Sequence, residues 1–365
     1  MKKRYSILLA ICLIMIVINL LARVCTPFAD FYAEKIFPLI TNPVSFISGI
    51  FPFSFGEVLI ILALLLVLIG MPLTVILLIF GKNFRRKTAG TACFIYLFVF
   101  TFILSTETMN CFIMYQCTPF AEKYLTPSGH TRTQLTELYS VLIDKANDLA
   151  EKVPRDSMNC FEYSGDVNSE ARKAMKKAGE TFPQLKGHYP KAKPIQFSYF
   201  MSQSHLSGIY FPFSLEANYN DDMCRTNLPE TVCHEYSHLK GFIQEDEANF
   251  IAFYATTRCS DDISFQYSGY LEALEYVHNQ IYSNNISDAY YLTDSISDNV
   301  RRDWFRFLPD NYWQENEKKE VIPTETVSTV STTALDTNIK MNGRTEGVET
   351  YSLMVELLLD FYYPE

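Results

Sequence analysis

The sequence predicts three N-terminal transmembrane helices followed by an α+β domain that is mostly helical. Two observations lead to this fold class. Residues 1–110 are strongly apolar, whereas residues 111–365 have the mixed composition of a water-soluble domain. In this second part most apolar residues recur at helical spacing, and two short segments alternate in the manner of strands. A chain of 365 residues is long enough for a membrane anchor and a separate domain, with the boundary expected near residue 110.

Three stretches of Ile, Leu, Val and Phe carry almost no charge and cover about residues 5–24, 58–80 and 91–108. Each has close to the ~20 residues that a helix needs to cross a bilayer. A buried helix of a soluble protein rarely runs so long without a polar face. The first stretch follows basic residues 2–4 and therefore also resembles a signal peptide. Because no small-x-small cleavage site follows it, we expect an uncleaved anchor, with the lipid bilayer as a partner.

Basic residues are unevenly distributed around these stretches. Residues 2–4 are basic, and the loop 81–90 contains four more: Lys82, Arg85, Arg86 and Lys87. The loop 25–57 contains one, Lys35. The positive-inside rule therefore predicts that the N-terminus and the loop 81–90 are cytoplasmic. Three spans then leave residues 111–365 outside, so we expect a multi-pass protein of the cytoplasmic membrane with an extracytoplasmic domain.

Composition excludes some function classes. The net charge of −10 and a pI near 5.2 argue against a nucleic-acid partner, because phosphate binding requires a basic surface. The nine cysteines form no C-x-x-C pair, which argues against a thiolate zinc site or a thioredoxin-like motif. Six of them follow residue 110 and would be able to form disulfides in an extracytoplasmic domain.

The second part of the chain alternates between helical and strand patterns. Helices are expected at about residues 129–153, 169–179, 229–240, 245–258, 264–282 and 347–362. Strands are expected at residues 195–200 and 207–213, which are aromatic and β-branched. Residues 314–333, rich in Glu, Lys, Ser and Thr, are expected to form an exposed, partly mobile connection.

The pattern His234-Glu235-Tyr236-Ser237-His238 carries the clearest chemistry. Two histidines four residues apart project from one face of a helix, so both imidazoles can bind one Zn²⁺ ion. Glu235 lies beside the first of them and would act as the general base on a zinc-bound water. Gly241, three residues after His238, is a suitable residue to end the helix.

A catalytic zinc site uses three protein ligands and leaves one position open. Glu245 and Glu247 are the candidates for the third ligand, since both follow closely in the next predicted helix. We favour Glu245, because Asn249 shares its helix face and is placed to hydrogen-bond a ligand. Glu247 remains the alternative ligand. Acidic residues at this position also suit the dipole of an ordinary helix N-terminus.

The sequence from His234 through Gly241 to Glu-Asp-Glu-Ala-Asn-Phe-Ile-Ala resembles a family of uncharacterised bacterial membrane proteins. This family is a domain of unknown function whose members are described as zinc metallopeptidases. The resemblance extends over nearly the whole chain, including residues 208–213, 216–218 and 342–347. It implies a zincin-like metallopeptidase domain anchored in the bacterial cell membrane.

A more distant resemblance concerns the helix that follows the histidines. Glu245-Asp246-Glu247-Ala248-Asn249 is similar to the Glu-x-x-Ala-Asp helix of membrane gluzincins, whose first Glu is the third zinc ligand. The resemblance implies that role for Glu245. The present chain has Asn249 where those enzymes have Asp, and its spacing from His238 is shorter.

We therefore expect a membrane-anchored zinc metallopeptidase with one Zn²⁺ per chain. It would hydrolyse peptides or protein segments at the outer membrane surface, with Glu235 as general base. The alternatives are a zinc-binding pseudo-enzyme that serves as an envelope sensor or scaffold, and a zinc hydrolase of a cell-wall amide. An intact Glu235 favours hydrolysis over binding alone.

The strand region near the motif is the expected place for an extended substrate. Tyr210 and Phe211, followed by Ala217 and Asn218, would contribute an edge strand that pairs with a peptide by β-augmentation. Surface or core positions are expected for the remaining histidines, which show no ligand spacing: His130, His188, His205 and His278. His205 precedes the expected strand and is the candidate for an electrophile among them.

Overall fold

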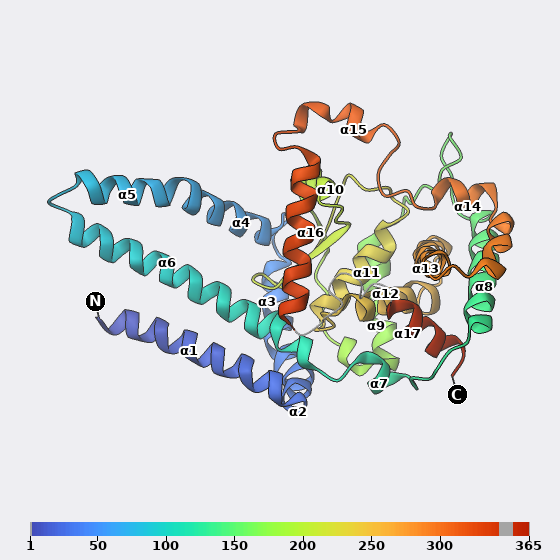
Figure 1. The fold of residues 1–365 in the computed structure, drawn as a ribbon, viewed down its shortest axis with the longest axis horizontal. Coiled ribbons are helices and arrows are strands. Elements are labelled where there is room, and N and C mark those ends of the chain that lie inside the picture. Colours follow the sequence, from blue (N-terminus) through green and yellow to red (C-terminus); the bar gives the residue numbers. More distant parts are fainter. Residues whose placement is uncertain (1, 343–352, 365) are drawn as a thin grey trace. The chain divides into compact units, whose positions relative to one another are not determined.

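The computed structural model of the protein describes residues 2–342 and 353–364 (Figure 1). The chain divides into two compact units. The first unit comprises Met1–Cys117 and Phe211–Glu216, and the second comprises Thr118–Tyr210 and Ala217–Glu365. The protein is mostly helical, with one small sheet.

Three helices of the first unit are long and apolar enough to cross a membrane, which confirms the prediction of three N-terminal apolar helices (Figure 1). They cover Lys3–Val24, Phe55–Phe80 and Arg85–Gln116. The first is α1 (Lys2–Val24), the second joins α4 (Phe55–Leu65) to α5 (Met71–Phe80), and the third begins with α6 (Arg85–Glu107). α6 packs against both α1 and α5. Most of their Ile, Leu and Phe side chains point outward, as lipid-facing side chains do.

Two side chains, a hydroxyl and a carboxylate, fix the start of α4 through three hydrogen bonds. The side chain of Ser54 accepts a hydrogen bond from the backbone N–H of Glu57 at 3.1 Å. The carboxylate of Glu216 accepts two more, from Phe55 N at 3.2 Å and Gly56 N at 2.7 Å. An anion at a helix N-terminus satisfies N–H groups that have no partner within the helix. This places the start of the second apolar helix three residues before the predicted residue 58.

Short helices complete the first unit. They are α2 (Thr26–Phe31), a π-helical turn (Tyr32–Ile36) and α3 (Phe37–Ser48), which connect the first two apolar helices. Tyr32 donates a hydrogen bond from its hydroxyl to the backbone oxygen of Met109 at 2.9 Å. This contact ties the connection to the end of the third apolar helix.

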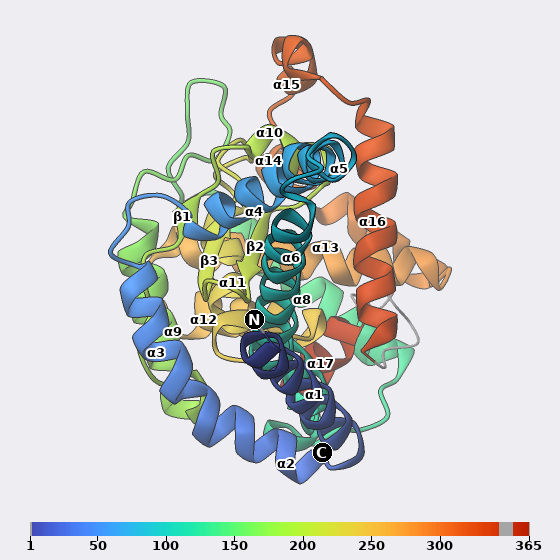
Figure 2. The ribbon, with the colours of Figure 1, turned by 90° about the vertical axis from the view of Figure 1, so that its left-hand side faces the viewer.

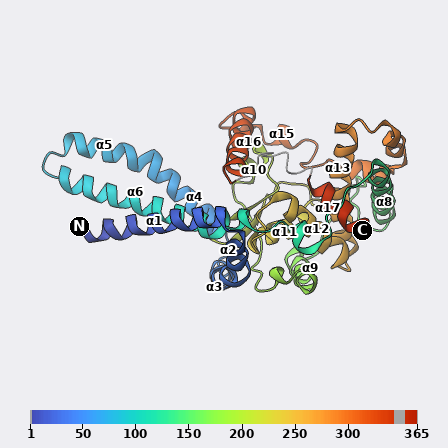
Figure 3. The ribbon, with the colours of Figure 1, turned by 60° about the horizontal axis from the view of Figure 1, so that its bottom comes forward.

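Six helices pack into the core of the second unit (Figure 3). They are α8 (Arg132–Ala150), α9 (Val167–Thr181), α11 (Leu228–Leu239), α12 (Glu245–Arg258), α13 (Ile263–Ser283) and α17 (Leu353–Tyr362). α13 packs on α8, and α12 packs on α11, α13, α9 and α17. The helices predicted from the sequence are therefore confirmed within a few residues. Only the first part of the helix predicted at 347–362 lies outside the described residues.

Apart from α16 (Thr324–Met341), the remaining helices of the second unit are short. They are α7 (Phe120–Tyr124), α10 (Ser198–Gln203), α14 (Asp298–Asp303) and α15 (Tyr312–Glu315), with 3-10 turns at 183–185, 287–295 and 317–319.

The sheet has three strands in the order β1-β3-β2 (Figure 2). They are β1 (Lys193–Pro194), β2 (Gly208–Phe211) and β3 (Glu216–Tyr219). β1 runs parallel to β3, with Lys193 opposite Asn218. β2 is thus the outer strand on one side of the sheet. Its position within residues 207–213 agrees with the prediction, whereas β3 was not predicted.

The strand predicted at residues 195–200 is wrong. β1 ends at Pro194, and α10 occupies the second half of the predicted segment. Ser198 and Met201 are both buried and three residues apart, which is the spacing of one helix face. The aromatic residues that suggested alternation are exposed: Phe197 and Phe200.

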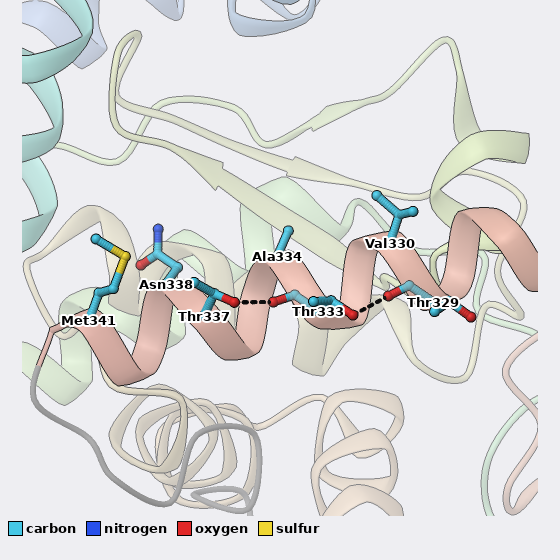
Figure 4. A pocket seen from close by; sticks show the side chains of 7 residues that line it. All are labelled: Thr329, Val330, Thr333, Ala334, Thr337, Asn338 and Met341. Carbon is cyan, nitrogen blue, oxygen red and sulfur yellow. Dashed lines mark hydrogen bonds between the residues drawn. The ribbon is translucent and has the colours of Figure 1, made fainter.

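The connection predicted at residues 314–333 is mostly exposed, as expected, but its second half is helical, because α16 spans Thr324–Met341. Its threonines satisfy their hydroxyls within the helix (Figure 4). Thr333 donates to the backbone oxygen of Thr329, and Thr337 donates to that of Thr333, both at 2.7 Å. Threonine has a low helix propensity partly because its hydroxyl competes for backbone hydrogen-bond partners. In α16 these two hydroxyls bond to backbone oxygens of the helix itself. A depression of about 540 Å³ lies along this face, lined by Thr329, Val330, Thr333, Ala334, Thr337, Asn338 and Met341 (Figure 4).

Candidate metal centre

A tight turn brings the end of α11 beside the start of α12. Gly241 has a φ of 89°, a conformation that side chains disfavour, and its N–H donates to the backbone oxygen of His238 at 2.9 Å. Phe242 N donates to Ser237 O at 3.2 Å. The chain then enters α12 at Glu245, so the first turn of α12 lies against the last turn of α11.

His234, His238 and Glu245 converge as a result of this turn. Oε2 of Glu245 lies 3.2 Å from Nε2 of His234 and 3.7 Å from Nε2 of His238. The two imidazole rings are 4.5 Å apart and nearly perpendicular. The side chains are 13%, 10% and 17% exposed, in the order of the sequence. The cluster is therefore largely buried but still reachable from solvent.

The donor set fits a tetrahedral metal ion. Two ligands bound at about 2.0–2.1 Å in a tetrahedral arrangement lie roughly 3.4 Å apart, close to both N···O distances here. Nδ1 of His238 lies 2.8 Å from the backbone oxygen of Phe242. A carbonyl oxygen only accepts, so Nδ1 must carry the proton, and the lone pair of the neutral ring is on Nε2. Within the described residues, this is the one group of three or more His, Cys, Asp or Glu side chains that could hold a metal ion.

In the metal-free protein, the three side chains shift one another's pKa values. Burial alone would lower the pKa of His238, but the carboxylates of Glu245 and Glu235 outweigh it and raise that pKa to about 9. Burial likewise opposes ionisation of Glu245, yet the histidines hold the pKa of its carboxyl far below the usual range. Burial, and then the charge of His238, lowers the pKa of His234. The stable state at neutral pH is thus an ion pair between His238 and Glu245.

Glu235 contributes a second carboxyl group beside the cluster. Its side chain is buried, and among the described residues its Oε2 atom has no hydrogen-bond partner. Burial raises its pKa to about 8; the charge of Glu245 adds to this effect, and that of His238 opposes it. Buried polar atoms in folded proteins nearly always have a partner, so an orphaned carboxylate oxygen marks a functional position.

Strand β2 closes one side of this carboxylate. A Cβ atom added at Gly208 would lie 2.3 Å from Oε1 of Glu235, so only glycine fits there with Glu235 in its present position. Gly208 belongs to the segment that carries the family resemblance, but its role was not predicted. The signal was available in the sequence as a glycine at the start of an expected strand, where close backbone approach is one known reason for glycine.

The alternative ligand Glu247 has a different contact. Its Oε1 atom accepts a hydrogen bond from Phe120 N at 2.7 Å, at the first residue of α7. It does not join the group formed by the two histidines and Glu245. Asn249 hydrogen-bonds His234 and raises the pKa of that ring. Its amide also donates to the hydroxyl of Tyr276 at 2.9 Å.

The expected substrate strand is only partly accessible. Tyr210 is half-buried, with its ring centroid 6.2 Å from that of His238. Phe211, Ala217 and Asn218 are buried, and Phe211 packs on Gly56 within the first unit. Of the four residues, only Tyr210 is both next to the cluster and partly exposed.

The other histidines lie outside the cluster. His130 pairs with Asp360 at 2.7 Å, and Nδ1 of His278 lies 2.8 Å from the hydroxyl of Tyr139. His205 is exposed, and its ring lies 6.5 Å from that of Phe307. Four cysteines of the second unit are free thiols: Cys160, Cys224, Cys233 and Cys259.

Replacement of the candidate ligands separates their roles. We expect Glu245→Ala to weaken zinc binding by more than about a hundredfold, beyond the 10–100-fold that loss of a hydrogen-bonding partner such as Asn249 typically costs. Glu247→Ala should keep zinc affinity but lower thermal stability, because it orphans the buried N–H of Phe120. Competition with a chromophoric chelator measures the affinities. Loss of zinc from Glu247→Ala but not from Glu245→Ala would show that the wrong carboxylate has been assigned.

Zinc binding should depend on pH through His238. Its raised pKa of about 9 means that the free protein holds a proton there at pH 7, and a metal ligand must be neutral. Zinc affinity should therefore rise about tenfold per pH unit between pH 7 and 9 and level off above. Calorimetry in buffers of different ionisation enthalpy should detect the released proton. An affinity that stays constant from pH 7 to 9 would contradict the ion pair.

Comparison with known proteins gives a family but no activity. No curated protein and no solved structure matches the chain. One family model, described as "Protein of unknown function (DUF3810)", matches residues 32–359. This match covers most of the chain, including part of the apolar unit, the sheet and the whole of the candidate metal centre. The chain therefore belongs to the DUF3810 family of proteins of unknown function.

Proposed function

We propose that the protein is a membrane-anchored zinc metallopeptidase with a zincin-like domain. The observation that carries this proposal is the arrangement of His234, His238 and Glu245 around a common point, with the orphaned carboxylate of Glu235 beside them. Three ligands with one open position are typical of catalytic zinc, whereas structural zinc has four protein ligands. Among the described residues no fourth His, Cys, Asp or Glu completes the group.

His234, His238 and Glu245 would hold the ion. When bound, Zn²⁺ supplies a Lewis acid for the scissile carbonyl and acidifies a water molecule to a pKa of roughly 7. Asn249 and the backbone oxygen of Phe242 hold the two imidazoles in orientation through hydrogen bonds.

Glu235 is the proton carrier in this proposal. Its free oxygen accepts a proton from the attacking water and later gives it to the leaving amine, which conserves charge over the cycle. A carboxyl group can serve as the base in the first step and as the acid in the second. A protein that only bound zinc would have no use for a buried carboxylate without a partner, and this favours hydrolysis over a sensor or scaffold role.

The edge strand β2 would position the substrate. Gly208, Ile209 and Tyr210 are half-buried on the outer strand of the sheet, next to Glu235 and His238. An extended peptide can add to such an edge through backbone hydrogen bonds, which bind many sequences alike. This supports a peptide or protein segment as substrate. A cell-wall peptide amide would be cleaved by the same chemistry.

The proposed location is the outer face of the bacterial cytoplasmic membrane. Basic residues cluster at the start of the first apolar helix, and in the connection after Phe80 together with the first turn of the third helix, which favours a cytoplasmic position for both. With three apolar helices, the second unit then faces outward.

Glu235→Gln should abolish hydrolysis without loss of zinc. The amide has the same shape but cannot take up the proton, so kcat/KM for a peptide pool should fall by about 10²–10⁴-fold. Asp148→Asn, at an exposed carboxylate on α8, is the control and should keep full activity. Unchanged turnover of the Glu235→Gln protein at full zinc occupancy would rule out this mechanism.

Gly208→Ala should displace the side chain of Glu235 by steric overlap. The new methyl group would overlap the carboxylate, and a displacement of about 1 Å at a catalytic group can cost 10²-fold in rate. Zinc affinity should change little, because the three atoms nearest to the new methyl group all belong to Glu235 and not to a proposed zinc ligand. Gly129→Ala is a matched control, since an added Cβ there meets no atom within 4 Å. Equal activity of the two variants would mean that β2 does not constrain the base.

A further inference from the structure

Three glutamates outside the metal centre are linked in a row between α11 and α13: Glu272 is an electrostatic neighbour of both Glu230 and Glu275. Glu230 lies one helical turn before His234, and Glu272 and Glu275 lie on α13. The backbone N–H of Glu230 donates to the hydroxyl of Ser268 at 3.3 Å. Ser268 is one turn before Glu272, so this contact sets Glu230 against the face of α13 that carries Glu272. Of all neighbouring charges, that of Glu272 acts most strongly on Glu230.

Hydrogen bonds connect this acidic cluster to the metal centre. Glu272 hydrogen-bonds Tyr276, one turn further along α13. The hydroxyl of Tyr276 accepts from the amide of Asn249 at 2.9 Å, and Asn249 hydrogen-bonds His234. A group bound at the acidic cluster would therefore lie beside the candidate metal centre.

Among the described residues, the cluster has no positively charged partner. In the part of the chain that the structure describes, no Lys, Arg or His forms an ion pair with Glu230, Glu272 or Glu275. Glu230 is only 7% exposed, and its Oε1 atom has no hydrogen-bond partner among the described residues. Burial raises the pKa of all three carboxyls, to about 7 for Glu272 and about 8 for Glu275, where the charge of Glu272 adds to it. Buried carboxylates without a counter-charge are costly, so the cluster would gain from a cation.

The spacing favours an organic cation over a second metal ion. Within the described residues, the carboxylate oxygens of the three glutamates do not come together closely enough to form a metal-ligating group. An ammonium or guanidinium group is larger than a metal ion and carries several N–H donors, so it can serve carboxylates that lie further apart. Glu272 and Glu275 are half-buried and therefore partly accessible to solvent, whereas Glu230 is buried.

We propose that Glu230, Glu272 and Glu275 form a subsite that binds a positively charged group of a peptide substrate beside the metal centre. The inference rests on the proposed peptidase function and specifies its substrate class. The cation is an ammonium or guanidinium group, carried either by a lysine or arginine side chain or by the free N-terminus of the peptide.

Binding to the full-length, zinc-loaded Glu235→Gln protein tests the subsite without turnover. Four pools of short synthetic peptides are compared by calorimetry: lysine-containing or acetyl-lysine-containing, each with a free or an acetylated N-terminus. The lysine pools should bind at least about tenfold more tightly than the acetyl-lysine pools if a side chain is recognised. If the N-terminus is recognised, the pools with a free N-terminus should instead bind at least about tenfold more tightly than those with an acetylated N-terminus.

A second substitution shows where the preference arises. Adding Glu272→Gln should reduce it by about tenfold or more, whereas adding Asp148→Asn at an exposed site should leave it intact. Glu275→Gln is the second variant if Glu272→Gln fails to fold, as judged by zinc content. Equal affinity for all pools, or a preference that survives both glutamine substitutions, would overturn the subsite.

Parallel turnover assays with the wild-type protein keep the two proposals apart. Cleavage of the pools without any charge preference would leave the peptidase proposal standing and remove the subsite. A charge preference in binding, with no cleavage by the zinc-loaded wild-type protein, would retain the subsite and remove the peptidase.

Discussion

The carboxylate of Glu245 lies between two imidazoles, and the left-handed turn at Gly241 holds it there. This contact orders the rest of the site. In the metal-free protein Glu245 is ionised and His238 is protonated, so each buried charge has a partner. A divalent cation would replace the proton in the same arrangement. The domain can therefore fold before the metal arrives, with the ligands already close to the distances that a tetrahedral ion needs.

Two other carboxyl groups near this contact have incomplete hydrogen bonding. Within the described residues Glu235 has an orphaned oxygen, and Glu230 has another, five residues earlier on the same helix. A core selected only for stability would replace them with apolar residues, because an isolated buried carboxyl destabilises the fold. The positive His238 opposes the shift at Glu235, whereas Glu230 has only negative neighbours. Because of this contrast, we assign proton transfer to Glu235 and cation binding to Glu230.

Local patterns in the sequence predicted the features that depend on local physics. The apolar helices follow from length and composition, and the convergence of His234, His238 and Glu245 follows from helical spacing and the glycine after the motif. The features that failed depend on distant contacts. The aromatic residues of the segment 195–200 suggested alternation, but Ser198 and Met201 are buried at helical spacing. The contact between Gly208 and Glu235 joins segments more than twenty residues apart, which no local pattern encodes.

X-ray absorption at the zinc edge of the purified, zinc-loaded protein tests the central claim most directly. Our account predicts one zinc per chain, bound by two imidazole nitrogens and by oxygen ligands from one carboxylate and one solvent molecule, at about 2.0–2.2 Å. A sulfur ligand at about 2.3 Å would contradict it, because the nine cysteines of the chain take no part in this site. A zinc coordination shell with only one imidazole nitrogen would also contradict our account.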